Sequence, residues 1–348
     1  MKDKIGIIAV GQAGGNIGQL FEESGYSVLY LNTSQEDLDT LKNAKHKYHI
    51  TGGEGCNKDR NKAKQLVIDD FDNIAEQIDE ILKCEILFVV FAAGGGTGSG
   101  AGPMLMDLLL DGSSRFVGAV TVLPAQTESI KAQINAYECF SELVQIEASA
   151  AVFVIDNNNG EKMQLNPQFV NSFNGFVDIP EKYRSDRGNI DTAEAMESLK
   201  AHGMAVVMQY GNSNSKIADI LSSLNKTIYA PLEPDKRIKY ITGAFDESVR
   251  DFIDLQKTVG IPVDIFRAYS GKDKAHLMLS GLSYPKTRLD VIHEYVSENK
   301  ERIMNNLNAG TIRLDNDINF LSAPAAPVQP KTGKQQSRQE IMSRYLRK

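Results

Sequence analysis

The residues best suited to chemistry in this chain are grouped in short glycine-rich segments. The densest covers residues 94–100, where five of seven residues are glycine and the other two, Thr97 and Ser99, carry hydroxyl groups. Closely spaced glycines let backbone N–H groups approach an anion, and a helix that starts there adds positive potential. A tight turn needs only one or two glycines. The segment therefore predicts a phosphate-binding loop.

Two further glycine-rich segments, residues 11–18 and 51–57, would extend such a site. None of the three contains the Gly-Lys-[Ser/Thr] of a P-loop, which argues against a Walker-type NTPase. The spacing in residues 11–18, G-x-x-G-G-x-x-G, also departs from the G-x-G-x-x-G dinucleotide fingerprint, and the next expected strand ends near Asn32 rather than an acidic residue. An NAD-dependent oxidoreductase stays open as a distant alternative.

Asparagine suits purine recognition because its side-chain amide carries both a donor and an acceptor. Several asparagines lie near expected strand ends or on the helix that follows the last of these strands. Each fits a turn or a helix cap equally well when taken alone. The candidates are Asn16, Asn32, Asn157, Asn158, Asn171 and Asn174.

Short apolar runs alternate with helical patterns through the first half of the chain. Strands are expected at residues 5–10, 26–31, 86–91, 116–123 and 151–155, and helices at 17–24, 57–82, 99–110 and 127–147. This alternation predicts an α/β fold with a doubly wound, mostly parallel sheet, whose ligands sit at the carboxyl ends of the strands. A helix at 167–182, four strands within 203–283 and a closing helix at 287–307 predict a second, smaller α/β domain.

Composition narrows the protein class. The 348 residues are 42% hydrophobic and 24% charged, as in globular proteins, and no run approaches the roughly 20 apolar residues of a membrane span. No secretory segment follows the first residues. The three cysteines lie far apart, which argues against a disulfide framework or structural zinc and favours the cytoplasm. Residues 331–348 carry six basic residues and one acidic residue, although the whole chain has a net charge of −7.

The glycine-rich loops resemble those of the tubulin/FtsZ superfamily. Residues 94–100 match its GGGTG[ST]G signature at every position, and residues 11–18 resemble the tubulin GQAGxQIG loop with Asn16 in place of Gln. Residues 188–194 match the GxxNxDxxE synergy loop from the Asn onward. The resemblance implies a GTPase that uses GTP/GDP and Mg²⁺ and assembles head to tail, so that one subunit's synergy loop completes its neighbour's active site.

The same resemblance assigns residues to the GTP site. Glu128 would contact the ribose, and Asn158 and Asn174 would read guanine. It implies no direct protein ligand for Mg²⁺, although Gln12 or Glu54 would lie near the ion. The complete set of implied GTP contacts is Gly11, Gln12, Ala13, Asn16, Asn32, Gly55, Cys56, Asn57, Gly94, Gly95, Gly96, Thr97, Gly98, Ser99, Glu128, Asn158 and Asn174.

The implied catalytic residues, Asn189, Asp191 and Glu194, act in trans. Asp191 and Glu194 would polarise the attacking water, which suits a reaction that mostly needs positioning and charge stabilisation. Independently of the resemblance, these carboxylates fit a cap on a helix that starts near Thr192.

The resemblance also implies a division of the chain. Residues 1–165 would form the GTP-binding domain and residues 166–187 the central helix. Residues 188–310 would form a C-terminal activation domain with the synergy loop and the closing helix. Residues 311–348 would be a linker and a basic tail, since 322–337 are rich in Ala, Pro, Gln, Lys and Ser.

Within the superfamily the chain resembles the plasmid- and phage-borne TubZ group most. Asn32-Thr33-Ser34 lacks the Asp that division-type FtsZ has there, and the last residues do not resemble the FtsZ peptide that binds division anchors. TubZ filaments segregate plasmid or phage DNA, so this function is predicted, with an FtsZ-like cell-division ring as the alternative.

The tail, Ser337 to Lys348, has the apolar spacing of a short amphipathic helix that orders on a partner. Its apolar residues are Ile341, Met342, Tyr345 and Leu346. A solvated, frayed end fits the same residues. By resemblance the tail would engage a DNA-bound adaptor of TubR type, and the protein would contact DNA indirectly and no membrane.

Overall fold

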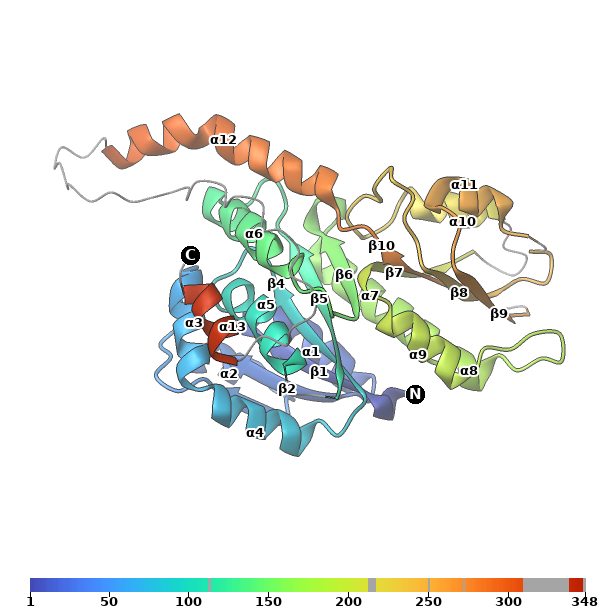
Figure 1. Cartoon of the computed structure of the whole chain (residues 1–348), viewed down its shortest axis with the longest axis horizontal. Helices are drawn as coiled ribbons and strands as arrows, with labels where there is room; N and C mark the ends of the chain where they lie inside the picture. Colours follow the sequence, from blue (N-terminus) through green and yellow to red (C-terminus); the bar gives the residue numbers. More distant parts are fainter. Residues whose placement is uncertain (112–113, 212–216, 250, 272, 309–337, 347–348) are drawn as a thin grey trace.

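In the part of the chain that the structure describes, ten strands form one continuous sheet in the order β3-β2-β1-β4-β5-β6-β7-β10-β8-β9 (Figure 1). The computed structural model describes residues 1–111, 114–211, 217–249, 251–271, 273–308 and 338–346. Only the two pairs made by β10, with β7 and β8, are antiparallel among the described strands. The strands are β1 Ile5–Val10, β2 Ser27–Asn32, β3 His46–His49, β4 Ile86–Ala92, β5 Phe116–Leu123, β6 Ala151–Asp156, β7 Gly203–Tyr210, β8 Tyr240–Phe245, β9 Asp264–Tyr269 and β10 Ala275–Leu282.

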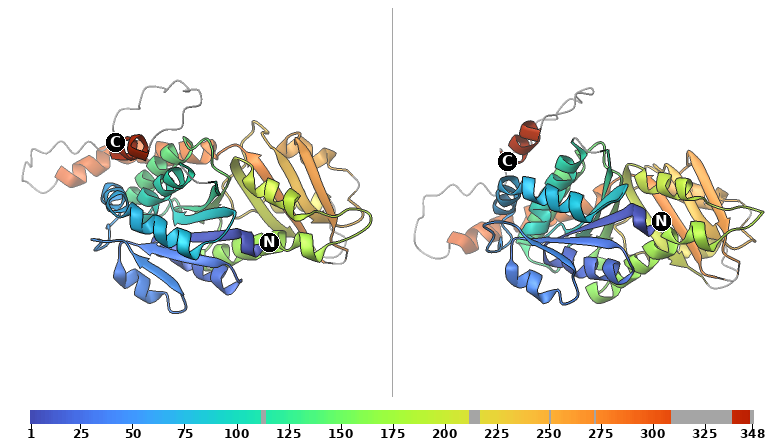
Figure 2. Two further views of the ribbon diagram at one scale, coloured as in Figure 1. Left: turned by 60° about the horizontal axis from the view of Figure 1, so that its bottom comes forward. Right: turned by 90° about the horizontal axis from the view of Figure 1, so that it is seen from below.

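Helices cover both faces of this sheet, as Figure 2 shows. Strands β1 and β6 are therefore buried at every position. The apolar sequence of β1 and the apolar run of β6 before Asp156 fit that environment. The predicted α/β fold with a mostly parallel sheet is confirmed. The helices are α1 Gly11–Glu23, α2 Gln35–Thr40, α3 Arg60–Asp69, α4 Phe71–Ile81, α5 Thr97–Leu110, α6 Ile130–Leu143, α7 Lys162–Val177, α8 Ile179–Lys182, α9 Thr192–Lys200, α10 Ile217–Leu224, α11 Ile253–Val259, α12 Lys286–Asn308 and α13 Arg338–Leu346, with 3₁₀ turns η1 Lys2–Lys4 and η2 Asn157–Asn159.

The single helix expected over residues 57–82 is in fact two helices, α3 and α4, which meet at Asp70. The Asp70 carboxylate accepts hydrogen bonds from Tyr48 Oη (2.8 Å), Thr51 N (2.8 Å) and Asn73 Nδ2 (2.7 Å). These bonds hold the junction against β3, and the Asp70 backbone, at φ −112° and ψ 10°, leaves helical geometry. Apolar residues continue on both sides of the break, so their spacing alone did not reveal it.

The helix α7 crosses the centre of the molecule and is held by an aromatic cluster. The ring centroid of Phe173 lies 5.5 Å from that of Phe21 and 5.7 Å from those of Phe88 and Phe153. Offset and edge-to-face rings at this spacing add to the stabilisation from burial. The helix begins at Lys162, five residues before its expected start, and its rotation is set by these contacts.

The second half of the chain extends the first sheet instead of forming a separate one. Strand β7 pairs in parallel with β6, and β10, β8 and β9 follow it. The domain boundaries at residues 165, 187 and 310 stay a prediction. The expected linker, 322–337, lies outside the described residues. In the described part of the chain no helix is long and apolar enough to cross a membrane.

Candidate functional site

A cavity of about 420 Å³ opens at the carboxyl ends of β1, β4 and β5, where the sheet topology predicts a ligand. The three glycine-rich segments meet there. Of the residues expected at a nucleotide, those lining the cavity are Gly11, Gln12, Ala13, Gly55, Cys56, Asn57, Gly94, Gly95, Gly96, Thr97, Gly98 and Glu128.

Four of the expected residues lie next to the cavity without lining it. Asn16 is exposed on α1. Buried Asn32 donates through Nδ2 to Asp37 Oδ2 (3.3 Å). Ser99 is buried beneath the phosphate loop and donates to the Gly95 carbonyl. The side-chain oxygen of Asn158 accepts a hydrogen bond from the backbone N–H of Gln126 (2.7 Å).

Two helices point their N-termini at the cavity. Helix α1 starts at Gly11, directly after β1 and well before its expected start at residue 17, because Gly11 makes the turn at φ +71°. A Cβ at Gly11 would lie 3.2 Å from the backbone N of Gly98, at the start of α5. Neither helix has an acidic residue in its first turn. Their unpaired N–H groups and dipoles are therefore available to an anion.

The buried residue Thr33 ties the loops together behind this surface. Its Oγ1 lies 2.7 Å from Thr97 Oγ1 and 3.3 Å from Cys56 Sγ. The end of β2 is thus linked to both the phosphate loop and the loop before α3. Such contacts hold backbone donors in fixed positions before a ligand arrives.

Two lysines outside the set predicted from the sequence, Lys58 and Lys162, line the cavity. The ammonium of Lys58 donates to Ser129 Oγ (2.7 Å), and that of Lys162 lies 3.5 Å from Glu128 Oε1. Lys131 donates to the carbonyl of Asn57 (3.3 Å) and so supports the same loop. These ammonium groups add positive charge at an anion site.

Two buried amide oxygens without protein partners belong to residues that line the other end of the cavity. They are Oδ1 of Asn157, just after β6, and Oδ1 of Asn166 on α7. The amide of Asn157 also donates to Glu128 Oε1 (3.3 Å). A buried acceptor left unpaired is costly. The pair therefore suits a ligand edge that presents N–H donors, as guanine does.

The expected guanine contact on the central helix, Asn174, does not line the cavity. Its Nδ2 donates to Ser24 Oγ (2.8 Å), at the end of α1. On α7 it is Asn166 that lines the cavity. The spacing of Lys162 and Asn166, four residues apart on one helical face, was the available signal.

Asp37, in the first turn of α2, is a second carboxylate that lines the cavity besides Glu128. Glu54, which was considered near the metal, is exposed and does not line it. Within the described residues no group of three or more His, Cys, Asp or Glu could hold a metal ion by itself. A cation here would depend on one carboxylate, the Gln12 amide and the ligand.

The predicted catalytic loop lies elsewhere. Asp191 and Glu194 form a capping box on α9: Asp191 Oδ1 accepts from Glu194 N, and Glu194 Oε2 accepts from Asp191 N, both at 2.9 Å. This confirms the expected helix cap. With Asn189, Glu194 lines a shallow surface hollow beside β9 and α11. Figure 1 shows the loop between α8 and α9 on the far side of the molecule from α3.

Comparisons with known proteins agree with this geometry. The model of the Tubulin/FtsZ family GTPase domain matches residues 4–163. A tubulin-like protein TubZ of a Clostridium botulinum C phage is 31% identical over 306 residues, covering 86% of this chain and 84% of that protein.

Two solved structures are similar in fold. The crystal structure of Clostridium botulinum phage c-st TubZ matches with a TM-score of 0.78 at 28% identity, covering 87% of this chain and all of that one. A GTPγS-form protofilament of Bacillus thuringiensis TubZ matches in fold, with a TM-score of 0.72 at 17% identity over 89% of this chain and 95% of that one.

Proposed function

This chain belongs to the Tubulin/FtsZ family and carries its GTPase domain, and from this premise we propose that it forms head-to-tail filaments that hydrolyse GTP between subunits and segregate plasmid or phage DNA. One observation carries the proposal. The phosphate-binding loops lie on one side of the molecule, and the acidic loop that would orient water lies on the far side. Only a second copy brings the two together.

The cavity fits a guanine nucleotide along its length. The N–H groups of residues 11–13 and 94–98 would hold the phosphates, and the loop at Gly55 to Asn57 would close around the last of them. Glu128 and Lys162 would face the ribose. The unpaired oxygens of Asn157 and Asn166 would accept from the guanine N1–H and amino group. A dinucleotide-dependent oxidoreductase has no comparable support.

The oxygen-bearing side chains at the cavity also suit Mg²⁺. This ion keeps several waters and binds through one or two carboxylates together with substrate phosphates. Asp37 and the Gln12 amide line the phosphate end of the cavity and would hold the ion's hydration shell. Bound there, Mg²⁺ would neutralise charge on the phosphates.

The capping box fixes the side chains of Asp191 and Glu194, which would orient water at the nucleotide of a neighbouring subunit. Each carboxylate uses one oxygen to fix the start of α9, so both side chains are held in place. The remaining oxygens are free to accept a hydrogen bond from a water bound beside a neighbour's γ-phosphate. Glu194 would orient and partly deprotonate that water, with Asp191 and Asn189 positioning it.

Mixing two inactive variants tests this arrangement. Glu194→Gln removes the charge yet keeps an acceptor for the cap, and we expect a loss of GTP turnover of about 100-fold or more. Gly95→Val fills the phosphate site, because a Cβ there meets only Ala92 O, at 3.7 Å, within the protein. An equal mixture should recover turnover, up to about a quarter of the wild-type rate if subunits assort randomly.

A matched control is Glu197→Gln, which changes an exposed carboxylate one turn further along α9 and should leave turnover unchanged. Unaltered turnover in Glu194→Gln, or a mixture no more active than its components when both variants are folded, would contradict hydrolysis in trans.

The DNA-segregation part of the proposal draws on the phage relative and on the tail. The described tail residues form the amphipathic helix α13, which is the kind of element that a partner protein binds in a groove. We propose that a DNA-bound adaptor of TubR type is that partner. Deleting residues 331–348 should abolish recruitment of adaptor–DNA complexes to filaments while filaments still pellet with GTP. Unchanged recruitment would refute the tail's role, and localisation to a division ring would favour the cell-division alternative.

A further inference from the structure

The tail helix α13 lies against the outer face of the GTPase domain, next to α3 and α5 (Figure 2). Ile341 and Tyr345, one helical turn apart, are each only 3% exposed. Met342 is partly buried in the same contact, whereas Leu346 stays about half exposed. The apolar stripe that the sequence predicts is therefore already used by the chain itself.

Charge complementarity supports this docked position of α13. Arg338 pairs with Asp72 on α4 (2.7 Å), and its guanidinium lies 4.6 Å from the centre of the Phe71 ring. Arg344 pairs with Asp107 on α5, which also accepts a hydrogen bond from Tyr345 Oη (3.4 Å). A basic helix thus meets acidic groups at both ends.

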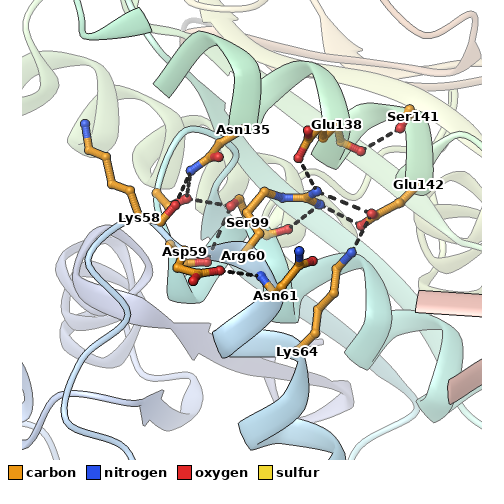
Figure 3. Close-up of polar contacts among 12 residues, drawn as sticks. Lys58, Asp59, Arg60, Asn61, Lys64, Ser99, Asn135, Glu138, Ser141 and Glu142 are labelled. Atoms are coloured by element: carbon orange, nitrogen blue, oxygen red, sulfur yellow. Dashed lines mark hydrogen bonds and ion pairs between the residues drawn. The ribbon is translucent and has the colours of Figure 1, made fainter. Parts of the chain in front are cut away.

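Beneath the tail, a buried charge cluster leads to the phosphate loop (Figure 3). Lys64 Nζ lies 5.4 Å from the centre of the Tyr345 ring and 2.7 Å from Glu142 Oε1. The other Glu142 oxygen is 2.6 Å from Arg60, whose guanidinium also donates to the Ser99 carbonyl (3.1 Å) in the first turn of α5. Burial lowers the pKa of Lys64, and Glu142 opposes this effect.

We propose that the face formed by α3, α4 and α5 is a binding site for the chain's own tail helix, and that the docked helix stabilises the phosphate loop through Lys64, Glu142 and Arg60. Tyr345 covers Lys64 and excludes water from its ion pair. Undocking admits water to the cluster and loosens the hold of Arg60 on Ser99. Because coupling is reciprocal, an occupied nucleotide site also favours the docked tail.

The tail helix then has two mutually exclusive partners, the GTPase domain and the adaptor. An adaptor that binds the Ile341 and Tyr345 stripe has to displace α13 from the GTPase domain first. That consequence rests on the proposed function, whereas the docking and its coupling to the nucleotide site do not.

Amide hydrogen exchange of the full-length protein tests the docking. A free helix of nine residues is marginal in water, so undocked amides in residues 338–346 would exchange at nearly unprotected rates. We expect protection in the wild type and at least about tenfold faster exchange in Tyr345→Ala and Asp107→Asn. Leu346→Ala, on α13, and Asp111→Asn, at the residue directly after α5, are the matched controls and should keep the protection.

Nucleotide affinity tests the coupling. Tyr345→Ala and Asp107→Asn should bind GDP about 3- to 10-fold more weakly than the wild type and the two controls. Unprotected tail amides in the wild type would overturn the docking, as would protection that grows with protein concentration, since the helix would then come from another copy. Lost protection with unchanged GDP affinity would overturn the coupling.

These measurements need no adaptor, DNA, assembly or GTP hydrolysis. A failure of the tail inference is thus separate from a failure of the proposed filament function, which would appear as absent assembly or absent complementation.

Discussion

Two asparagines on α7 show how helical rotation selects a side chain for a site. Asn166 and Asn174 are eight residues apart, which places them about 80° apart around the helix and about 12 Å apart along it. Asn166 reaches the cavity, whereas Asn174 bonds Ser24. Either residue fits a guanine-binding amide by type alone, and only the position of the helix separates them.

We predict that Asn166→Ala weakens GTP binding about tenfold or more, because it removes an acceptor for guanine. Asn174→Ala, the matched change, should leave GTP affinity within about twofold and lower the free energy of unfolding by about 1 kcal/mol through the lost bond to Ser24. Nucleotide titration and denaturant unfolding measure both effects. Equal losses of affinity in the two variants would contradict the assignment.

His276 on β10 makes the stability of the native protein depend on pH. It is buried, and its Nε2 lies 3.2 Å from Tyr183 Oη. Burial, with a smaller effect of Lys182, lowers the pKa of His276 from 6.5 to about 4. As pH falls below 6.5, the unfolded chain binds a proton at this site that the native protein does not, so the native state loses stability until about pH 4.

We therefore predict that the wild type loses about 2 kcal/mol more free energy of unfolding between pH 7 and pH 5 than His276→Gln does. Urea unfolding at several pH values measures this difference. A parallel pH dependence in the two proteins would mean that His276 takes up its proton in the folded state at an ordinary pH.

At the scale of elements, α3, α5 and α6 are joined by charge as well as by apolar packing. Arg60 and Lys64 on α3 are 5% and 1% exposed, and both bind Glu142 on α6. Arg60 also reaches Glu138, which is half exposed. One buried carboxylate thus compensates two buried cations, and the start of α5 is tied to both helices through Ser99.

Glu142→Ala should lower the free energy of unfolding by about 3–5 kcal/mol, because it leaves two buried cations without their partner. Glu138→Ala removes an exposed partner of the same arginine and should cost less than about 1 kcal/mol. Denaturant unfolding of the two variants distinguishes them. Similar small losses would mean that water enters the cluster.

At the scale of the whole molecule, the cavity and the acidic loop lie apart, so under the proposed function GTP hydrolysis would depend on contacts between copies. A heterologous interface that does not close extends into a filament, and each added subunit completes another site. In the structure the loop that holds Asp191 and Glu194 lies on the far side of the molecule from α3.

We predict that GTP turnover per molecule falls as the protein is diluted below its assembly concentration. Steady-state phosphate release over a dilution series measures this, and light scattering of the same samples reports assembly. Turnover per molecule that does not change with dilution would show that one chain hydrolyses GTP alone.

The sequence predicted the parts of the site that depend on local motifs. A glycine-rich loop that directly follows a strand lies at the edge of the sheet where ligands bind, and residues 11–13 and 94–98 do line the cavity there. The alternation of short apolar runs with helical patterns predicted the mostly parallel sheet. Strands of such a sheet are covered by helices on both faces, so their sequences are apolar throughout.

Tertiary structure decided which polar residues complete the site. Asp37, Lys58, Lys162 and Asn166 reach the cavity because distant elements pack together. The spacing of Lys162 and Asn166 indicates that they share one helical face, but it does not specify that this face meets the cavity. The helix break at Asp70 depends on a hydrogen bond from Tyr48, and the docked position of α13 depends on an ion pair between Arg338 and Asp72. In both cases the partners are far apart in the sequence. The sequence by itself determined the chemistry of the phosphate loops, and only the packing of helices on the sheet decided which side chains surround them, because side-chain direction follows from helix rotation.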